Sequence, residues 1–515
     1  MNRWKNIGVL VLISLCLASC TLIGNTSTGT STAKPIHYST SFKQSACPFP
    51  LQAGFVDGRN VVCGFLLVPE DRTDPHSATI QLAVAIFKTP SATPAPDPVI
   101  FLQGGPGGRV IQDFAPLVMS HQLDLANQFD NHDLIFIDQR GTGYSTPSLQ
   151  CPEYINVLFM TDQNLPPDQQ VTQQDNALVQ CHDRLVKSGI KLSAYTTYSD
   201  AADVHDLIGA LKLQQVDLYG VSYGTRLALE VMRAFPQHIR SVVLDSTVPA
   251  QERLITSVPS DLARVYSVLF KGCAADPSCN AKYPSLESVF YADVASLNAH
   301  PATFQTQDPE NNKTYTVIFT GNNFADLLFS TFYATNVIPA LPGMIYQVQQ
   351  GNYNIPSLLY GPLFLDDSVS WGMYFSVECA EDLAFTTPQA VAAAGQAYPQ
   401  QIRSYELTGL KGEFPVCSAW KVPAVAKSES QPVTSAIPTL VLEGEYDPIT
   451  PPTNGALAAK TLRNSYQFLF PASGHGVFLF NPSSCPTTIV VEFERNPAQK
   501  PDSSCIASMS EPQFQ

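Results

Sequence analysis

Short apolar runs that end in polar or glycine-rich loops recur along the first half of the chain. Four of them are rich in Val, Ile and Leu: DPVIFLQGGPGG, DLIFIDQRGTG, VDLYGVS and SVVLDST. Runs of this length and composition are typical of strands buried on both faces of a parallel sheet. Before them, CGFLLVPED and TIQLAVAIFK flank a polar turn with Asp74-Pro75, which predicts an antiparallel pair.

Helical patterns alternate with these strands. The stretch SDAADVHDLIGALKL is one such pattern, and either Ser199 or Asp200 is available to cap the amino terminus of the helix. After Ser222, apolar residues recur at three- and four-residue spacing, as on the buried face of a helix: Leu227, Ala228, Val231, Met232 and Phe235. Alternation of strand and helix predicts an α/β fold.

The alternation breaks after Pro249. From there to about Gln431 the chain is mostly helical or irregular and rich in aromatic residues, as in LARVYSVLFKGC. Two further strand patterns follow, IPTLVLEGEYDP and SYQFLFPASGHG. We interpret the intervening segment as a large lid inserted between the sixth and seventh strands of the sheet.

The amino terminus has the layout of a targeting segment. Arg3 and Lys5 precede the apolar run IGVLVLISLCL, which is too short to span a bilayer, and LASC ends at Cys20. This ending resembles the lipobox of bacterial lipoproteins, which implies cleavage before Cys20 and a lipid on its sulfur. A Ser/Thr-rich tether follows. We therefore expect an extracytoplasmic protein anchored to the bacterial cell membrane by lipid, with plain secretion as the alternative.

Charge and cysteine content narrow the possibilities. A formal net charge of −15 argues against a nucleic-acid partner, because phosphate contacts need basic patches. Of twelve cysteines, ten remain beyond Cys16 and Cys20, and an even number suits disulfides in an oxidising compartment. Five local disulfides between sequence neighbours are the simplest hypothesis, and no Cys/His spacing suggests zinc: Cys47 and Cys63, Cys151 and Cys181, Cys273 and Cys279, Cys379 and Cys417, Cys485 and Cys505.

The chemistry centres on Ser222, in the G-x-S-x-G between a predicted strand and a helix. A serine nucleophile needs a base and an acid that orients the base, and in α/β-hydrolases the chain order is Ser, acid, His. His475 in ASGHG and Asp447 in EGEYDPIT satisfy that order, each directly after a strand. Asp245, after the sixth strand, is the alternative acid. The lone motif could also be a packing turn, but three residues in the required order favour catalysis.

The oxyanion hole follows from the same strand order. QGGPGG stands after the third strand, where one backbone N–H is expected, and Gly105 is the preferred donor with Gly104 as the alternative. The second donor is the N–H of Tyr223, directly after the nucleophile. The glycine run lacks the G-K-[ST] ending of a phosphate loop.

GGPGG, DQRGTGYS, GVSYGT, GEYDPITP and SGHG, in this order, resemble the proline iminopeptidase and secreted tripeptidyl aminopeptidase group of α/β-hydrolases. The resemblance implies an α/β-hydrolase fold: a mostly parallel eight-stranded sheet flanked by helices, with a mainly helical lid between strands six and seven. The domains expected are a signal peptide (1–19), a tether (20–45), a first core part (46–249), the lid (250–431) and a second core part (432–515).

The resemblance also implies a serine exopeptidase that removes residues from a free amino terminus, without metal or cofactor. Because a free α-amine is largely cationic at neutral pH, such an enzyme needs carboxylates under the lid. Glu378 and Glu381 in SVECAEDLAF are the candidates, unless this stretch is a solvated acidic turn. An esterase or amide hydrolase with the same triad is the alternative, and a non-catalytic binding protein is the third. The oligomeric state is not predicted.

Overall fold

The computed structural model describes residues 38–123, 128–510 and 512–515. The predicted signal peptide, the lipidated Cys20 and the tether up to residue 37 lie outside the described residues. In the part of the chain that the structure describes, no helix combines the length and the apolar character needed to cross a membrane.

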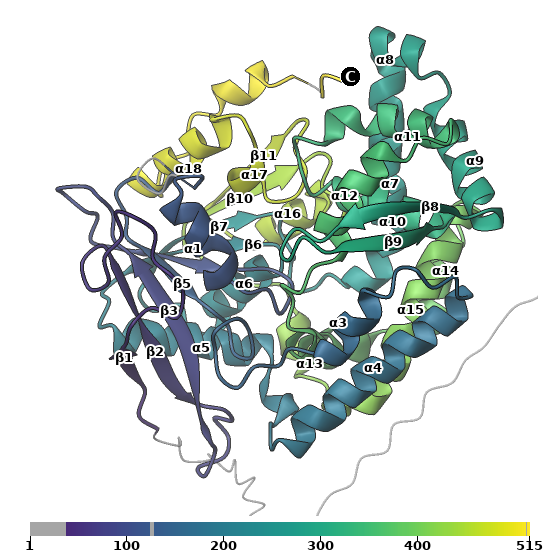
Figure 1. The fold of residues 1–515 in the computed structure, drawn as a ribbon. Helices are drawn as coiled ribbons and strands as arrows, with labels where there is room; N and C mark the ends of the chain where they lie inside the picture. Colours follow the sequence, from purple (N-terminus) through teal and green to yellow (C-terminus); the bar gives the residue numbers. More distant parts are fainter. Residues whose placement is uncertain (1–37, 124–127, 511) are drawn as a thin grey trace, which may run out of the picture. The chain divides into compact units, whose positions relative to one another are not determined.

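A nine-stranded sheet forms the centre of this part of the chain, in the order β1-β2-β3-β5-β4-β6-β7-β10-β11 (Figure 1). The first three neighbouring pairs, from β1 to β5, are antiparallel, and the remaining pairs are parallel. The strands are β1 (Ser41–Gln44), β2 (Val61–Pro69), β3 (Thr79–Phe87), β4 (Val99–Leu102), β5 (Leu134–Ile137), β6 (Val216–Val221), β7 (Ile239–Asp245), β10 (Thr439–Gly444) and β11 (Ser465–Phe470).

The sheet corrects the sequence-based prediction at one edge. Eight strands were expected, whereas β1 adds a ninth, and its residues fall inside the segment predicted as tether (20–45). The strand is short, polar and mostly exposed, so neither its length nor its hydrophobicity marks it as a strand. Pairing with β2 is what fixes it.

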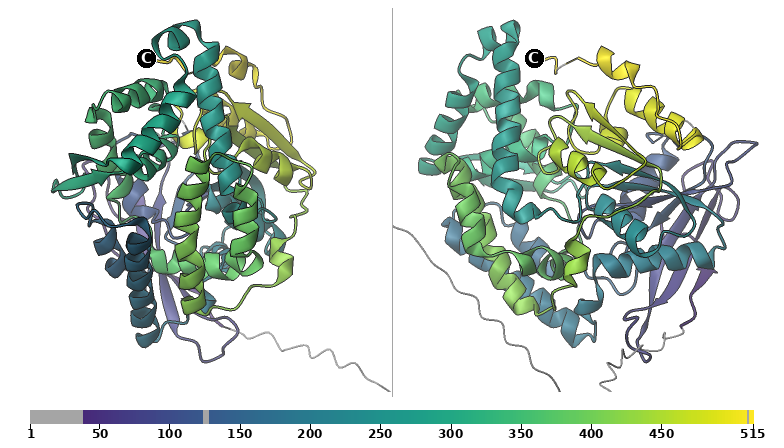
Figure 2. Two further views of the ribbon diagram at one scale, coloured as in Figure 1. Left: turned by 90° about the vertical axis from the view of Figure 1, so that its right-hand side faces the viewer. Right: turned by 180° about the vertical axis from the view of Figure 1, so that it is seen from behind.

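Helices cover both faces of the sheet because successive residues of each buried strand point to opposite sides. Phe101 of β4 packs in the core that α1 and α18 cover, and Leu102 packs in the core under α5, α6 and α16 (Figure 1, Figure 2). These helices are α1 (Ile111–Met119), α5 (Thr197–Ala210), α6 (Tyr223–Ala234), α16 (Pro452–Ala459) and α18 (Cys485–Arg495), and the short α17 (Val477–Phe480) precedes α18.

The insertion between β7 and β10 is mainly helical, as predicted, but contains a two-stranded hairpin that the sequence did not indicate. It has its own hydrophobic core, in which aliphatic side chains pack with many aromatic ones. Its elements are α7 (Leu254–Ala275), α8 (Pro277–Lys282), α9 (Leu286–Ala299), β8 (Ala302–Gln307), β9 (Thr314–Phe319), α10 (Gly321–Thr331), α11 (Leu341–Gln349), α12 (Asn354–Phe364), α13 (Trp371–Glu381), α14 (Pro388–Gly395) and α15 (Gln400–Trp420).

A second excursion joins this insertion. Helices α3 (Pro152–Leu158) and α4 (Pro167–Lys187) lie between β5 and α5 in the sequence, and α4 packs along α15 (Figure 1). Short 3-10 turns complete the fold: Leu192–Ala194, Ile338–Ala340, Leu383–Phe385, Lys427–Ser430 and Ser504–Ser508. The helical cover over the sheet therefore comes from two separate parts of the chain.

Five disulfides join the cysteine couples that sequence neighbourhood suggested. Three of them lie in this helical cover, where Cys273–Cys279 joins α7 to α8. Cys151–Cys181 ties α3 to α4, and Cys379–Cys417 ties α13 to α15.

Candidate active site

The turn from β6 into α6 carries Ser222 in a strained backbone conformation. Ser222 has φ 58° and ψ −130°, a combination that non-glycine residues rarely adopt. The two flanking glycines make room for the tight turn. A Cβ on Gly224 would lie 1.9 Å from the Leu102 carbonyl oxygen of β4, and one on Gly220 would lie 2.5 Å from the Gly224 oxygen. The motif is therefore a nucleophile elbow in geometry, with half-buried Ser222 at its apex.

The predicted base and acid are hydrogen bonded to each other. His475, on the loop between β11 and α17, lies with its Nδ1 2.9 Å from Asp447 Oδ2. Thr450 Oγ1 donates to the same Asp447 oxygen at 2.7 Å and stands 3.2 Å from His475 Nδ1. Thr450 belongs to the GEYDPITP stretch, but the sequence pattern predicted no role for it. This arrangement holds the imidazole with Nε2 turned away from the acid.

Burial and charge act in opposite directions on this pair. Burial alone lowers the pKa of His475, but the charge of Asp447 and its hydrogen bond outweigh burial and raise the pKa above the usual 6.5. For Asp447, burial favours the neutral acid, yet His475 and Thr450 together lower its pKa. Asp447 is therefore an anion at neutral pH and accepts the Nδ1–H of His475.

Neighbouring strand ends bring the base loop beside the elbow. A Cβ on Gly476 would lie 3.7 Å from a methyl carbon of Val221, the residue before the nucleophile. The N–H of Ser222 donates to the Asp245 carbonyl oxygen at 3.0 Å, and the N–H of Gly476 donates to Ser246 Oγ at 2.8 Å. Among the described residues no direct hydrogen bond joins Ser222 Oγ to His475, and such bonds are often long without substrate.

Asp245, the alternative acid, has a different task. Its carboxylate accepts the N–H groups of Val477 and Phe478 at 2.8 and 2.9 Å, at the start of α17, and the Tyr219 hydroxyl at 2.7 Å. Burial raises its pKa to about 6, although these donors oppose the rise. With its oxygens engaged in this way, Asp245 fixes the helix that follows His475 rather than orienting the imidazole.

The loop after β4 lies against the nucleophile. A Cβ on Gly104 would stand 2.7 Å from Ser222 Cβ and 3.1 Å from its Oγ, so only glycine fits there. Gly105, the preferred oxyanion donor, has φ 114° and lines the cleft described below. Gln139 braces the loop by donating to the Gln103 carbonyl oxygen at 2.9 Å. Tyr223, the other predicted donor, begins α6, where backbone N–H groups point out of the helix.

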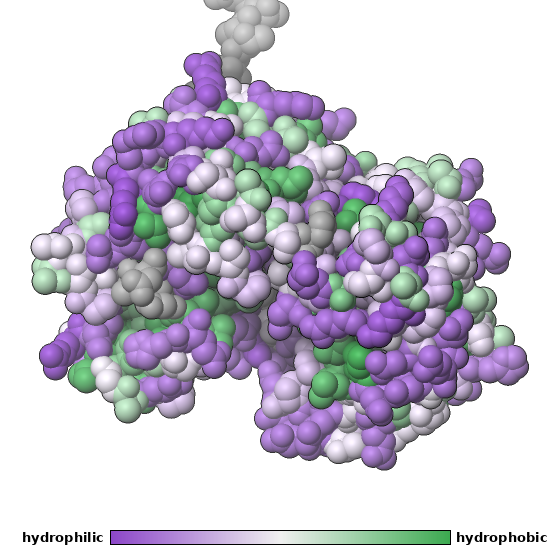
Figure 3. Space-filling view, turned by 90° about the horizontal axis from the view of Figure 1, so that it is seen from above, coloured by the Kyte–Doolittle hydropathy of each residue, from purple (hydrophilic) through white to green (hydrophobic). Residues whose placement is uncertain are grey.

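A cleft of about 1000 Å³ opens at this site, between the sheet and its helical cover. Three of its lining residues tie it to the chemistry: Gly105, Tyr333, whose ring centroid is 4.8 Å from that of His475, and Ile449 near Asp447. Figure 3 shows one face of the molecule, mostly hydrophilic and hollowed at its lower edge. The cleft volume of about 1000 Å³ suits a peptide-sized ligand.

Acidic groups dominate the charge of the cleft. Asp326, Glu378 and Glu413 line it, and none of the described lining residues is Lys, Arg or His. Burial, followed by the nearby charge of Asp382, raises the pKa of Glu378 well above its usual value, and the same two effects raise that of Glu413 to about 7. Such carboxyl groups, held in a low-dielectric wall, favour a cationic ligand.

Glu381, the second predicted amine ligand, does not line this cleft. Its two oxygens accept the backbone N–H and the hydroxyl of Thr197, both at 2.7 Å, at the start of α5. The structure therefore does not place Glu381 in this cleft: three residues after Glu378 on α13, its carboxylate is hydrogen bonded to the start of α5 instead. Glu413 takes the place beside Glu378, and no motif in the α15 sequence marks it.

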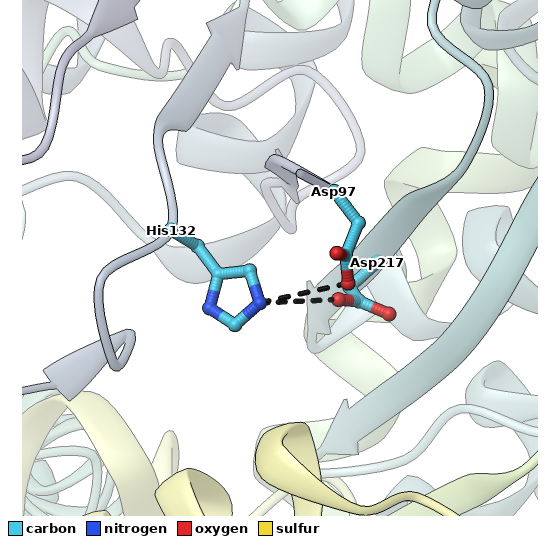
Figure 4. A group of neighbouring side chains, drawn as sticks. All are labelled: Asp97, His132 and Asp217. Carbon is cyan, nitrogen blue, oxygen red and sulfur yellow. Dashed lines mark ion pairs between the residues drawn. The ribbon is translucent and has the colours of Figure 1, made fainter. Parts of the chain in front are cut away.

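A second group of buried charges lies at the opposite edge of the sheet, where the parallel strands begin. His132 Nε2 faces Asp97 Oδ2 and Asp217 Oδ2 at 3.6 and 3.8 Å (Figure 4). Arg240 Nη1 stands 2.8 and 2.7 Å from the same two oxygens. The guanidinium therefore already supplies the positive charge that a metal ion would bring, and we assign no metal to this cluster.

Strand order, the elbow and the Asp447–His475 pair together define an α/β-hydrolase fold with a Ser-His-Asp arrangement. Residues 97–273 match the family model of the alpha/beta hydrolase fold, and residues 408–505 match the model described as TAP-like protein. The resemblance carried by the motifs is thus confirmed.

Three relatives illustrate it. A tripeptidyl aminopeptidase of Streptomyces coelicolor is 30% identical over 199 residues, which cover 38% of this chain and 36% of that protein. The chain thus matches little more than a third of that relative's length. Serine protease Hip1 of Mycobacterium tuberculosis H37Rv is 24% identical over 82% of this chain and 83% of its own. Carboxylesterase B of M. tuberculosis CDC 1551 is 25% identical, over 84% of each chain.

Proposed function

We propose that this chain is a serine exopeptidase that hydrolyses peptides from a free amino terminus, of the tripeptidyl or prolyl type. The observation that carries the proposal is Glu378 with Glu413 in the wall of a cleft that also reaches Gly105 and Tyr333, the ring neighbour of His475, and has no basic residue among its described lining. The names of the Streptomyces and Hip1 relatives support the same class of reaction.

The geometry gives each residue a role. Ser222 Oγ attacks the scissile carbonyl carbon while His475 Nε2 takes the hydroxyl proton, and Asp447 stabilises the resulting imidazolium. The N–H groups of Tyr223 and Gly105 stabilise the oxyanion. His475 then protonates the leaving amine, which leaves an acyl-enzyme on Ser222. The leaving amine is the shortened peptide. Water, deprotonated by His475, then attacks the acyl carbonyl carbon and releases the amino-terminal piece, while His475 returns the proton to Ser222 Oγ.

The acids of the cleft select the substrate. A free α-amine has a pKa near 8 and is mostly cationic at neutral pH. Burial favours the protonated form of Glu378 and Glu413, so an incoming ammonium group displaces a proton to solvent and takes the resulting carboxylate as its partner. An acetylated amino terminus has no charge and gains nothing from these carboxyl groups.

The test compares one unblocked peptide of about ten residues with its N-acetylated twin, with Ser222→Ala as the blank. We expect stepwise release of fixed-size pieces from the free peptide alone. Glu378→Gln should raise KM for the free peptide by roughly tenfold or more, because a charge-assisted contact is lost. Equal cleavage of both peptides by the wild-type protein would contradict amine recognition.

Glu381→Gln is the matched control. The amide replaces one of the two acceptors that hold Thr197, so this variant should lose thermal stability and keep its KM for the free peptide. An increase in KM equal to that of Glu378→Gln would show that position on α13, rather than access to the cleft, decides the effect.

Esterase activity is the second candidate, favoured by the carboxylesterase relative that aligns over most of the chain. The same triad would serve it, but Glu378 would not matter. Turnover of a simple ester that Glu378→Gln leaves unchanged, with no cleavage of either peptide, would favour it.

We further propose that the protein is anchored outside the cytoplasmic membrane by a lipid on Cys20. The lipobox-like LASC ending supports this, and five disulfides suit an oxidising compartment. Replacing Cys20 by Ala should move the protein from the membrane fraction to the soluble one and abolish labelling by radioactive palmitate. Continued labelling of the variant would refute the anchor.

A further inference from the structure

The catalytic base loop rests on a short segment of the insertion that follows α10. Gly474, the residue before His475, packs so closely on this segment that a Cβ there would lie 2.0 Å from the Phe332 carbonyl oxygen. The N–H of Gly474 also donates to Thr335 Oγ1 at 3.0 Å. A backbone carbonyl group and a side chain of the insertion thus both fix the position of the loop that carries His475.

Within the same segment, Tyr333 contacts the imidazole itself. Its ring centroid lies 4.8 Å from that of His475, with the ring planes inclined by 54°. His475 is only 6% exposed, while Tyr333 is 37% exposed and lines the cleft. The tyrosine ring therefore lies between the catalytic imidazole and the space that the substrate enters.

The insertion supports the acid loop as well. Phe332 stacks on Tyr446, the residue before Asp447, with centroids 6.3 Å apart. Arg264 of α7 donates to the Glu445 carbonyl oxygen at 2.8 Å and also to the carbonyl oxygen of Asp447. Both members of the Asp447–His475 pair consequently take their position from contacts with the helical insertion, and the Tyr333 ring is the contact on the reacting side chain.

We propose that Tyr333 is a positioning residue that holds the His475 imidazole in its working orientation and keeps water off its exposed side. The proposal rests on the triad of the proposed function. Nδ1 is already fixed by Asp447, so the remaining freedom is rotation of the ring about its side-chain bonds, and a large planar neighbour restricts that rotation. The contact needs the ring rather than the phenol hydroxyl.

Loss of the ring should change the pH profile in a defined direction. Asp447 and Asp245 are the charged groups that act on His475, and Asp326 and Asp447 act on Tyr333. Burial is the effect that lowers the pKa of His475, and removing Tyr333 relieves part of it, so that pKa rises. Because the base must be neutral, the acid limb of kcat then moves to higher pH.

The experiment measures kcat, KM and the kcat–pH profile of Tyr333→Phe, Tyr333→Leu and Tyr333→Ala on the unblocked peptide. Phenylalanine should keep kcat within about twofold, and alanine should lower it by roughly 10- to 100-fold, since misplacing a catalytic group costs about that much. Leucine, which preserves bulk, should fall between them and serves if the alanine variant does not fold. Wild-type kcat with an unshifted acid limb in Tyr333→Ala would overturn the proposal.

Phe329→Ala is the matched control, because Phe329 lines the cleft and packs edge-on against Tyr333 at 6.0 Å. Phe329→Ala should alter KM without moving the acid limb of the kcat–pH profile. If Tyr333→Ala likewise changed only KM, that result would also overturn the proposal. Ser222→Ala separates the two levels of the argument. Activity that survives Ser222→Ala refutes the proposed triad, whereas its loss combined with normal Tyr333→Ala kinetics refutes only the role of Tyr333.

Discussion

At the scale of single residues, Gly104 decides whether the nucleophile can stand where it does. A Cβ on Gly104 would lie 2.7 Å from Ser222 Cβ, closer than side-chain carbons tolerate, and Ser222 itself stands on a strained turn. Gly104→Ala should therefore lower kcat by about 100-fold through displacement of Ser222, with a smaller effect on KM. Steady-state kinetics and a thermal melt of the purified variant check this.

Gly209→Ala is the control at this scale. Gly209 is exposed on α5, and an added Cβ would meet nothing within 4 Å. Alanine is the better helix former, so this variant should keep wild-type kinetics and melt slightly higher. If Gly104→Ala also kept its kcat, the loop would have to shift freely, and the rigid packing of the oxyanion loop on Ser222 would be refuted.

At the scale of elements, the two candidate acids separate by what they hold. Asp447→Asn should lower kcat by about 10⁴-fold, because an amide favours the wrong imidazole tautomer. Asp245→Asn instead places an NH₂ group against donors at the start of α17, which should cost about 1–3 kcal/mol per unsatisfied group and lower kcat far less. Denaturant unfolding curves and kcat values of both variants test these two roles. Equal losses of kcat would contradict the assignment of different roles to Asp447 and Asp245.

The same contrast explains how much the sequence could predict. Ser222, Asp447 and His475 each follow an apolar strand directly, and because parallel strands end at one edge, chain order alone brings such residues together. Glu378 stood beside a cysteine in an acidic stretch, yet which of its neighbours faced the cleft depended on how α13 packs on α5. Glu413 carries no local signal, because its position comes from the packing of α15 on α4 and α13. Contacts between helices far apart in sequence leave no periodicity to detect.

At the scale of the whole molecule, buried acidic groups gather at both ends of the parallel strands, but they have different partners at the two ends. The carboxyl edge gathers acids around the cleft, whereas the amino edge closes Asp97, Asp217 and the 1%-exposed Glu494 around Arg240. Arg240 of β7 also donates to the Glu494 carbonyl oxygen and so fastens α18 to the sheet. Several carboxyl groups share one guanidinium there, and burial raises the pKa of Asp217 and of Glu494, which favours their protonated forms.

Stability should therefore fall as pH rises through neutrality. Burial raises the pKa of Asp217 to about 7, against about 3.9 in an unfolded chain, although Ser241 and Arg240 oppose the rise. For a carboxyl group with a raised folded pKa, the stabilisation is complete below the unfolded value and is lost as pH rises through the folded one. Asp217→Asn removes the titrating group. Its Oδ1 can still accept from Ser241, but its NH₂ group faces Arg240 Nη1, which lowers stability by a similar amount at every pH.

We expect the melting temperature of Asp217→Asn to change less between pH 4 and pH 8 than that of the wild type. Thermal melts across that range check the prediction, with the exposed Asp162→Asn expected to track the wild type throughout. A variant whose melting temperature changed with pH as much as that of the wild type would mean that Asp217 acts as a permanent ionic partner of Arg240. In that case the amino edge would be an ordinary buried salt bridge, and its acids would impose no dependence on pH.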